Sequence, residues 1–239
     1  MQPPHAFPSF TGIRAVTLDL DDTLWPIWPT IARAERVLLE WMHAHAPATA
    51  QALQDTTAVR AVRTEIVQLR PDLAHDLSAL RRESIRLALG RAGDDTALAE
   101  TAFDVFFAER QRVDLFDDAL PALEFLASRW PLVALSNGTA DVHAVGLGRF
   151  FHASVSAHLV GVAKPDPRIF ALAAEAAGVP AASVLHVGDD ARLDACAARD
   201  AGMHAVWLNR GGVDWPHEGA VPPATVASLA QLCQELAKG

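Results

Sequence analysis

Hydrophobic residues form two kinds of pattern along this chain, and the order of the patterns predicts an α/β fold. Continuous apolar runs without polar alternation indicate strands that are buried on both faces. Such runs occur at residues 13–20, 132–135, 184–187 and 205–208, and a weaker run covers residues 153–158. Helical spacing of apolar residues appears at residues 119–129, 169–177, 193–201 and 224–236. Strands that alternate with helices predict a Rossmann-like parallel sheet with right-handed crossovers.

The region from about residue 30 to residue 113 breaks this alternation. Its apolar residues recur at helical spacing, and it contains no convincing strand. The expected helix faces are Ile31, Ala34, Leu38 and Met42; Val59, Val62, Ile66 and Leu69; Leu80, Ile85, Leu87 and Leu89; and Phe103, Phe106 and Phe107. The third of these helices is expected to end at Gly90 or Gly93. A helical insert of this length predicts a separate all-helical cap at residues 29–113, with the core formed by residues 1–28 and 114–239.

Composition and charge narrow the class of protein. Of the 239 residues, 51% are hydrophobic, but no window approaches the length of a membrane span, so we expect a folded globular chain. A formal charge of -9 argues against binding to nucleic acid or to an anionic membrane surface. Two cysteines are too few for a disulfide framework, and the N-terminus lacks the features of a signal peptide. We therefore expect a cytoplasmic monomer or homodimer that acts on a small molecule.

Two carboxylates, Asp19 and Asp21, follow the first apolar run directly. In open α/β sheets, ligands bind at the carboxyl ends of the strands. Because alternate residues of a strand point to the same side, both carboxylates can face one reacting centre. Two like charges this close need a cation or a shared proton. The pair therefore predicts either a metal site or acid–base chemistry.

Three interpretations of this acid pair are open from its own residues. A calcium loop of the EF-hand type needs glycine at its sixth position and glutamate at its twelfth, where this chain has Leu24 and Thr30. A solvated turn would not explain the apolar run that precedes it. The third interpretation is a nucleophilic carboxylate beside an acid–base carboxylate, and later motifs strengthen it.

Ser136-Asn137-Gly138-Thr139 follows the second predicted strand. A hydroxyl and exposed backbone N–H groups at a strand-to-helix turn can cradle an anion, although an ordinary helix cap has the same pattern. A serine hydrolase is excluded here because the Gly-x-Ser-x-Gly elbow is absent. The turn therefore predicts an anion site only if other motifs lie beside it.

Lys164 is one of only two lysines among 20 basic residues, the other being Lys238 near the C-terminus. Lysine is a compact point charge, whereas arginine is a rigid fork. Pro165 restricts Lys164 to an extended conformation just ahead of a predicted helix. A lysine held in this way is suited to neutralising charge on a transferring group.

The segment from His186 to Asp194 again follows a predicted strand. Gly188 permits a tight turn, after which Asp189 and Asp190 project at the sheet edge, with Asp194 one helical turn further on. Hard carboxylate oxygens with few other protein ligands favour magnesium over zinc. One of these acids is also expected to cap the helix, and His186 is expected to be packed or to support a metal ligand rather than to bind metal itself.

The ordered motifs Asp-x-Asp-x-Thr, Ser-Asn-Gly, Lys-Pro and Gly-Asp-Asp-x-x-x-Asp resemble those of the haloacid dehalogenase superfamily. The resemblance covers about residues 13–209, and the insert lies where this superfamily carries its helical C1 cap. It implies that Asp19 is a nucleophile that forms an aspartyl-phosphate and that Asp21 is the general acid and then the general base. The implied binding groups are Ser136, Asn137, Gly138 and Lys164 for the phosphoryl group, and Asp19, Asp21 through its main-chain carbonyl, Asp189, Asp190 and Asp194 for magnesium or its support.

Asp21 also bears on the type of reaction. An acid at this position can protonate a leaving alkoxide and later activate water. The resemblance implies that dehalogenases of the superfamily lack it, so we expect a phosphatase. The chain is also similar to the YigB-type group of bacterial phosphatases in residues 131–138, 146–151 and 185–190, which implies FMN or a phosphorylated riboflavin precursor as substrate. Alternatives are a sugar- or nucleotide-monophosphate phosphatase, a 2-haloacid dehalogenase, and a non-catalytic metal-binding regulatory protein.

Substrate choice is expected to depend on the cap. Aromatic and cationic side chains there could stack on a ring or bind a second anion. The candidates are Trp25, Trp28, Trp41, Arg81, Arg82 and Arg86. Trp25 and Trp28 are preferred because they follow Asp21 in the loop that leads to the cap, whereas the arginines fit an ordinary solvated helix face.

Overall fold

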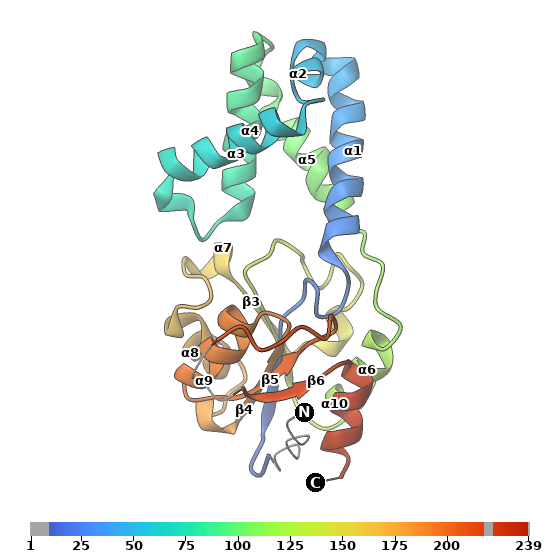
Figure 1. Cartoon of the computed structure of the whole chain (residues 1–239), viewed down its shortest axis with the longest axis vertical. Coiled ribbons are helices and arrows are strands. Elements are labelled where there is room, and N and C mark those ends of the chain that lie inside the picture. Colours follow the sequence, from blue (N-terminus) through green and yellow to red (C-terminus); the bar gives the residue numbers. More distant parts are fainter. Residues whose placement is uncertain (1–9, 218–221, 239) are drawn as a thin grey trace. The chain divides into compact units, whose positions relative to one another are not determined.

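The computed structural model describes residues 10–217 and 222–238, so the prediction about a signal peptide falls largely outside the described residues. The chain divides into two compact units (Figure 1). The first unit comprises the residues up to Pro26, Leu115–Gly138 and the residues from Val142 onward. The second comprises Ile27–Asp114 and Thr139–Asp141.

The first unit is built on a parallel six-stranded sheet in the order β3-β2-β1-β4-β5-β6. Its strands are β1 (Ala15–Leu18), β2 (Leu132–Ser136), β3 (Ala153–Ser156), β4 (Val184–Gly188), β5 (His204–Leu208) and β6 (Ala224–Val226). The first, second and fourth strands are buried at every position, as their unbroken apolar runs predict. The strand order of the sheet reverses at β1, because β2 pairs on one side of β1 and β4 on the other. The predicted ligand site therefore lies at the carboxyl ends of β1, β2 and β4.

Helices pack on this sheet where the sequence pattern indicates. They are α6 (Ala119–Ala127), α7 (Ala157–Val160), α8 (Pro167–Ala176), α9 (Ala197–Asp200) and α10 (Leu229–Leu236), with short 3₁₀ turns at Gly148–Phe150 and Ala181–Ser183. Ile169 and Phe170 of α8 and Ala198 of α9 are buried in one apolar cluster with Val133 and Val184 of the sheet. The α/β class with a parallel sheet is thereby confirmed.

Two details of the first unit differ from the sequence prediction. The helix expected over residues 224–236 is wrong at its start, because Ala224–Val226 pairs with β5 as a sixth strand and the helix begins at Leu229. Three residues at a sheet edge are too few to produce a recognisable strand pattern. The helix expected over residues 193–201 begins instead with a π-helical turn at Ala191–Cys196, which carries Asp194.

The second unit is all helical among the residues that the structure describes. Its helices are α1 (Ile27–His45), α2 (Pro47–Ala52), α3 (Thr56–Leu69), α4 (Leu77–Ala92) and α5 (Ala99–Arg110), with 3₁₀ turns at Pro71–Leu73 and Thr96–Leu98. Ala34, Leu38 and Met42 share a buried cluster with Phe103 and Phe106. The pattern predicted these faces but missed α2, which has only six residues. Leu69 is 61% exposed, although it was expected on a helix face.

Residues 139–141 belong to the helical unit although they follow β2 in the sequence. The side chain of Gln111 explains this membership. Its Nε2 donates to the Thr139 carbonyl over 3.1 Å, and its Oε1 accepts from the Asp141 amide over 2.8 Å. The helical unit therefore contains the predicted insert and a second, short segment. Within the described residues, no helix is both long and apolar enough to cross a membrane.

Candidate active site

Asp19 lies at the carboxyl end of β1, the strand at which the sheet order reverses. Its backbone N–H donates to the Val187 carbonyl of the neighbouring strand β4 over 3.0 Å. The residue is 7% exposed, so its carboxylate is held in a largely dry environment. Burial is the largest influence on this group and raises its pKa well above the ordinary value, with the negative charges of Asp194 and Asp189 acting in the same direction.

Lys164 supplies the positive charge next to Asp19. Its Nζ donates to Asp19 Oδ1 over 2.6 Å and to Asp194 Oδ1 over 2.5 Å, and the residue is 5% exposed. Burial acts to lower the pKa of Lys164, but the two carboxylates outweigh it and raise the pKa above its ordinary value. The ammonium group is therefore held in the charged form between two carboxylates.

Asn137 holds the backbone of Lys164. Its Nδ2 donates to the Lys164 carbonyl over 2.9 Å, and its Oδ1 accepts from the Lys164 N–H over 2.7 Å. Both ends of the amide are used in this way, so the structure gives Asn137 a positioning contact where substrate binding was predicted. The Lys164–Pro165 peptide bond is cis. The motifs after β2 and around Lys164 are thus joined by direct hydrogen bonds.

Asp194 is brought to the cluster by the π-helical turn after β4. Oδ1 accepts from Lys164 and lies 3.1 Å from His186 Nε2, and Oδ2 accepts from the Asp190 N–H over 3.0 Å. Burial acts to raise the pKa of Asp194, but Lys164 and His186 outweigh it and hold the pKa well below the ordinary value. A side chain at Gly188 would overlap the Asp194 carboxylate, so the turn requires glycine.

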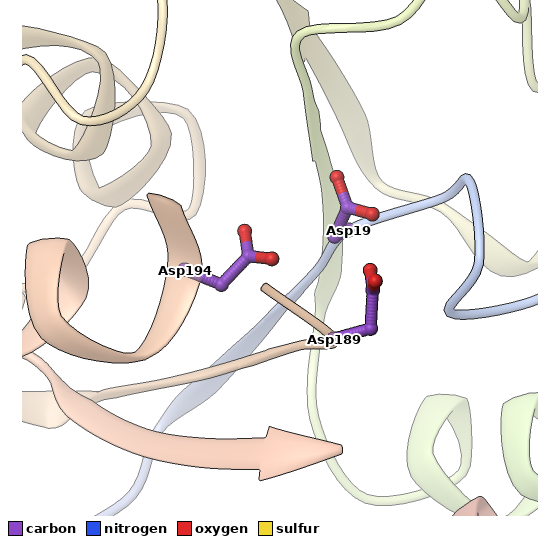
Figure 2. Close-up of side chains that lie close together, drawn as sticks. All are labelled: Asp19, Asp189 and Asp194. Carbon is purple, nitrogen blue, oxygen red and sulfur yellow. The ribbon is translucent and has the colours of Figure 1, made fainter. Parts of the chain in front are cut away.

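Three carboxylates meet at this edge of the sheet. Ligand oxygens of Asp19, Asp189 and Asp194 lie within 4.8 Å of one another, and Figure 2 shows them on separate segments of the chain. Burial, followed by the charge of Asp194, raises the pKa of Asp189 to about 7. This concentration of hard, negatively charged oxygens fits a divalent cation such as magnesium, whose charge would favour the ionised carboxylates.

Asp190 does not join this cluster, although it was predicted among the metal residues. Its Oδ1 accepts from the backbone N–H groups of Arg192 and Leu193 over 2.8 and 2.7 Å. It therefore caps the helical turn that carries Asp194. The capping role expected from the sequence is found, and the carboxylate is directed to the backbone for that reason.

Asp21 contacts a different set of groups. Its Oδ1 accepts from Trp25 Nε1 over 2.7 Å. A Cβ atom at Gly138 would overlap Asp21 Oδ2 and lie 3.1 Å from Ser136 Oγ, so the Asp21 carboxylate approaches the turn after β2 closely. Ser136 Oγ accepts from the Gly138 N–H over 2.9 Å. The structure thus brings the acid and the predicted anion-binding turn together.

Trp25 was predicted to contact substrate, and the structure does not support that expectation. Its side chain is fully buried, and its indole N–H is used by Asp21. A ring without exposed surface cannot stack on a ligand, so its observed contact is one that orients the acid. Trp28, in contrast, is 75% exposed.

The other aromatic and cationic candidates of the helical unit have partners within it. Arg81 and Arg82 lie over the rings of Phe106 and Phe103 at 4.2 and 3.7 Å. Arg86 pairs with Glu83 and Glu100, and Trp41 stacks on His45. Arg82 and Arg86 agree with the expectation of an ordinary helix surface, whereas Arg81 does not, because its side chain is only 17% exposed.

Two threonines were not predicted as site residues, and His186 was expected only to pack or to support a metal ligand. His186 is fully buried, and its Nδ1 lies 2.8 Å from Thr17 Oγ1 while its Nε2 faces Asp194. Burial is the main cause that lowers the pKa of His186, so the neutral ring donates from Nε2 to the carboxylate. Thr23 Oγ1 donates to Asp189 Oδ1 over 3.3 Å. The threonine of Asp-x-Asp-x-Thr signalled Thr23, but no sequence feature signalled the pairing of Thr17 with His186.

Residues 13–202 match the sequence model of the haloacid dehalogenase-like hydrolases. The chain is 36% identical, over 82% of its length and 83% of the relative, to the 5-amino-6-(5-phospho-D-ribitylamino)uracil phosphatase YigB of Escherichia coli. It is also 36% identical to a phosphoserine phosphatase of Thermus thermophilus over 55% of each chain.

A solved structure gives a similar result for the fold. The crystal structure described as 2-haloacid dehalogenase from Pseudomonas syringae pv. tomato superposes with a TM-score of 0.87 at 37% identity. The match covers 95% of this chain and 99% of that one. Its description names a dehalogenase, whereas the two curated relatives are named phosphatases. From the matched residues and the overall identity, this chain is an enzyme that belongs to the haloacid dehalogenase-like hydrolase family.

Proposed function

We propose that this hydrolase is a magnesium-dependent phosphomonoesterase that acts through an aspartyl-phosphate on Asp19. The observation that carries the proposal is the position of Lys164, whose ammonium touches both Asp19 and Asp194 in a buried site. A charge of this kind neutralises a nucleophilic carboxylate and the phosphoryl oxygens near it. A non-catalytic metal-binding protein would not need a second acid that is separately oriented, as Asp21 is by Trp25.

The proposed reaction proceeds in two steps, formation of the aspartyl-phosphate and its hydrolysis. In the first, an Asp19 oxygen attacks phosphorus while the bond to the leaving oxygen breaks, and Asp21 gives its proton to that oxygen. In the second, Asp21 takes a proton from water, which attacks phosphorus and releases phosphate and free Asp19. The Ser136 hydroxyl, which accepts from the Gly138 N–H, donates to a phosphoryl oxygen, and Lys164 offsets the charge of the phosphoryl group.

A bound magnesium ion would offset charge on the phosphoryl oxygens and on the carboxylates around it. Asp19, Asp189 and the main-chain carbonyl of Asp21 would hold it. Asp194 would support the site through Lys164, because the described contacts of its two oxygens are with Lys164, His186 and the Asp190 N–H. Asp190 would support it by capping the turn that carries Asp194.

The substrate that we propose is FMN or a phosphorylated riboflavin precursor. The support for it is the relative named for a phosphoribitylamino-uracil, which matches most of both chains. Sugar and nucleotide monophosphates are the alternative, because the core motifs do not determine the leaving group. The proposal includes a helical cap at residues 29–113, and a cytoplasmic monomer or homodimer as the working form.

A dehalogenase is the second candidate, because a similar solved structure is described as one. Such an enzyme would use Asp19 to displace halide and would not need a proton donor for the leaving group. Asp21 favours the phosphatase, since an alkoxide is a far poorer leaving group than halide and gains from protonation.

One panel of assays separates these functions. Phosphate release is measured with FMN, a phosphorylated ribitylaminouracil, nucleoside monophosphates, phosphoserine and p-nitrophenyl phosphate, with magnesium or with EDTA. Halide release from 2-chloropropionate is measured in parallel. The proposal expects magnesium-dependent phosphate release and no halide release. Halide release without phosphate release, or no turnover of any compound, would overturn it.

A further inference from the structure

The helical unit contains a cavity whose lining residues all belong to that unit. It measures about 570 Å³ and lies among residues of α1, α3 and α4. That volume is within the range of pockets that hold small organic ligands. Apolar side chains, among them Leu38, Met42, Val62 and Ile85, form a large part of its lining, and all four are buried or nearly so.

Cationic side chains gather on the wall of this cavity. Four arginines and one glutamate line it, namely Arg36, Arg60, Arg63, Arg81 and Glu35. In a chain with a formal charge of -9, such a local excess of positive charge is unusual. An excess of cations around an apolar floor is complementary to an anion that carries an apolar body.

Glu35 is shared between two of these arginines. It accepts from Arg63 Nη2 over 2.5 Å and, through a longer bond of 3.4 Å, from Arg81 Nη1. The Arg81 side chain is only 17% exposed. Burial and the charge of Arg63 lower the pKa of Arg81 to about 10, and Glu35 offsets this only in part. The guanidinium of Arg81 thus has a weak counter-charge and several donors left for another acceptor.

We propose that this cavity binds a small amphipathic anion, with its apolar body against the partly exposed lining residues Ile31, Leu39 and Leu53 and its anionic group on Arg81 and Arg63. The anionic group can be a carboxylate, a sulfonate or a phosphate, because each accepts hydrogen bonds from a guanidinium fork. The inference goes beyond the proposed hydrolysis, since every group that carries it lies in the helical unit. The ligand is either a separate molecule or the non-reacting part of the substrate.

The test is fluorescence titration of the full chain with the anionic dye 8-anilinonaphthalene-1-sulfonate and with its neutral relative N-phenyl-1-naphthylamine. We expect saturable binding of the anionic dye with one site per chain. Arg81→Gln should weaken that binding about tenfold, because a charge-assisted hydrogen bond is lost. The neutral dye should be nearly unaffected. Arg70→Gln is the matched control, since Arg70 pairs with Asp72 on the surface and is absent from the cavity wall.

Glu35→Gln gives a test of opposite sign that does not depend on the folding of the Arg81 variant. Removing the competing carboxylate should strengthen binding of the anionic dye. Equal affinities of the wild type and both variants for this dye, or equal effects on the neutral dye, would overturn the proposal. Inhibition of p-nitrophenyl phosphate hydrolysis by the anionic dye shows whether the natural ligand of the cavity is the substrate or a separate molecule. Competitive inhibition assigns the cavity to the substrate, and any other pattern assigns it to a separate ligand. Binding is measured without turnover, so failure of the proposed hydrolysis would be seen separately.

Discussion

The ammonium of Lys164 lies 2.6 Å from the carboxylate of Asp19, and both groups are buried. This contact places the positive charge of Lys164 beside the carboxylate that we propose as the nucleophile. Lys164→Met should lower kcat for p-nitrophenyl phosphate by about 10²- to 10³-fold, the usual effect of losing one group that stabilises transition-state charge. Lys164→Arg should recover little of the lost kcat, because a guanidinium fork is too bulky for the same position. Steady-state kinetics of both variants check this, and wild-type kcat in Lys164→Met would contradict it.

A substitution at Trp25 tests whether catalysis depends on the hydrogen bond that orients Asp21. Trp25→Phe keeps a buried ring but removes the N–H that donates to Asp21 over 2.7 Å. We expect kcat for alkyl phosphates to fall about tenfold with little change in KM, since a hydrogen bond to a charged group contributes on the order of 1.5–3 kcal/mol. p-Nitrophenyl phosphate should show a smaller loss in the first step because its leaving group needs no proton. Trp28→Phe is the control, because Trp28 is exposed. Equal losses in both variants would argue against an orienting role.

Substitutions at His186 and Thr17 test whether the hydrogen bonds from Thr17 through His186 to Asp194 contribute to catalysis. Thr17 Oγ1 and His186 Nδ1 are 2.8 Å apart, and the other ring nitrogen faces Asp194. His186→Phe leaves the buried carboxylate with one partner fewer, so kcat should fall about tenfold. Thr17→Val should show a smaller loss, and Thr17→Ser should recover most of it because it retains the hydroxyl. The measurement is kcat and KM beside thermal unfolding. A loss of stability without a change in kcat would show that the pair serves folding alone.

A pH effect on stability is expected from the pair of Asp118 and Arg210. Arg210 Nη1 and Nη2 donate to the Asp118 carboxylate over 3.1 and 2.8 Å, and the Leu229 N–H donates to it over 2.8 Å. Burial acts to raise the pKa of Asp118, but the hydrogen bonds from Arg210 outweigh it and lower the pKa. A carboxyl whose pKa is lower in the folded chain contributes stability above its unfolded pKa of about 3.9, and this contribution declines as the pH falls through the folded pKa.

Asp118→Asn should therefore lower the free energy of unfolding by about 1–2 kcal/mol at pH 7, where one charged partner of a partly exposed pair is lost. The difference from the wild type should shrink as the pH falls below about 4. Urea unfolding across this range measures it, with Asp104→Asn as the control for an exposed carboxylate. A difference that grows in acid would have the wrong sign for this account.

Most of the sheet and the main site residues could be predicted from the sequence, because each has a local signal. The runs that became β1, β2 and β4 are apolar throughout, and Asp19 and Asp189 follow such runs directly. The contact of Lys164 with Asp194 was harder to foresee, since it depends on a π-helical turn that has no clear pattern.

The differences between prediction and structure arise from tertiary contacts. Trp25 was expected to bind substrate because of its place in the sequence, but its burial and its bond to Asp21 are tertiary properties. Asp190 was expected to support the metal, with one of the acids also capping the helix, and the structure shows its backbone conformation directing it to the cap. β6 exists because its three residues find an edge strand, which a short sequence window does not show.

The central claim, that Asp19 carries the phosphoryl group, can be tested on the phosphoenzyme itself. Asp21→Asn with p-nitrophenyl phosphate should form the intermediate, because that leaving group needs no acid, and should hydrolyse it slowly, because water lacks its base. Rapid acid quench followed by mass spectrometry of the peptide that contains Asp19 measures the result. We predict one added phosphoryl group on Asp19, absent when Asp19→Asn is combined with Asp21→Asn. Phosphate release at the wild-type rate by Asp19→Asn, with no phosphoryl group on that peptide in any variant, would contradict the account.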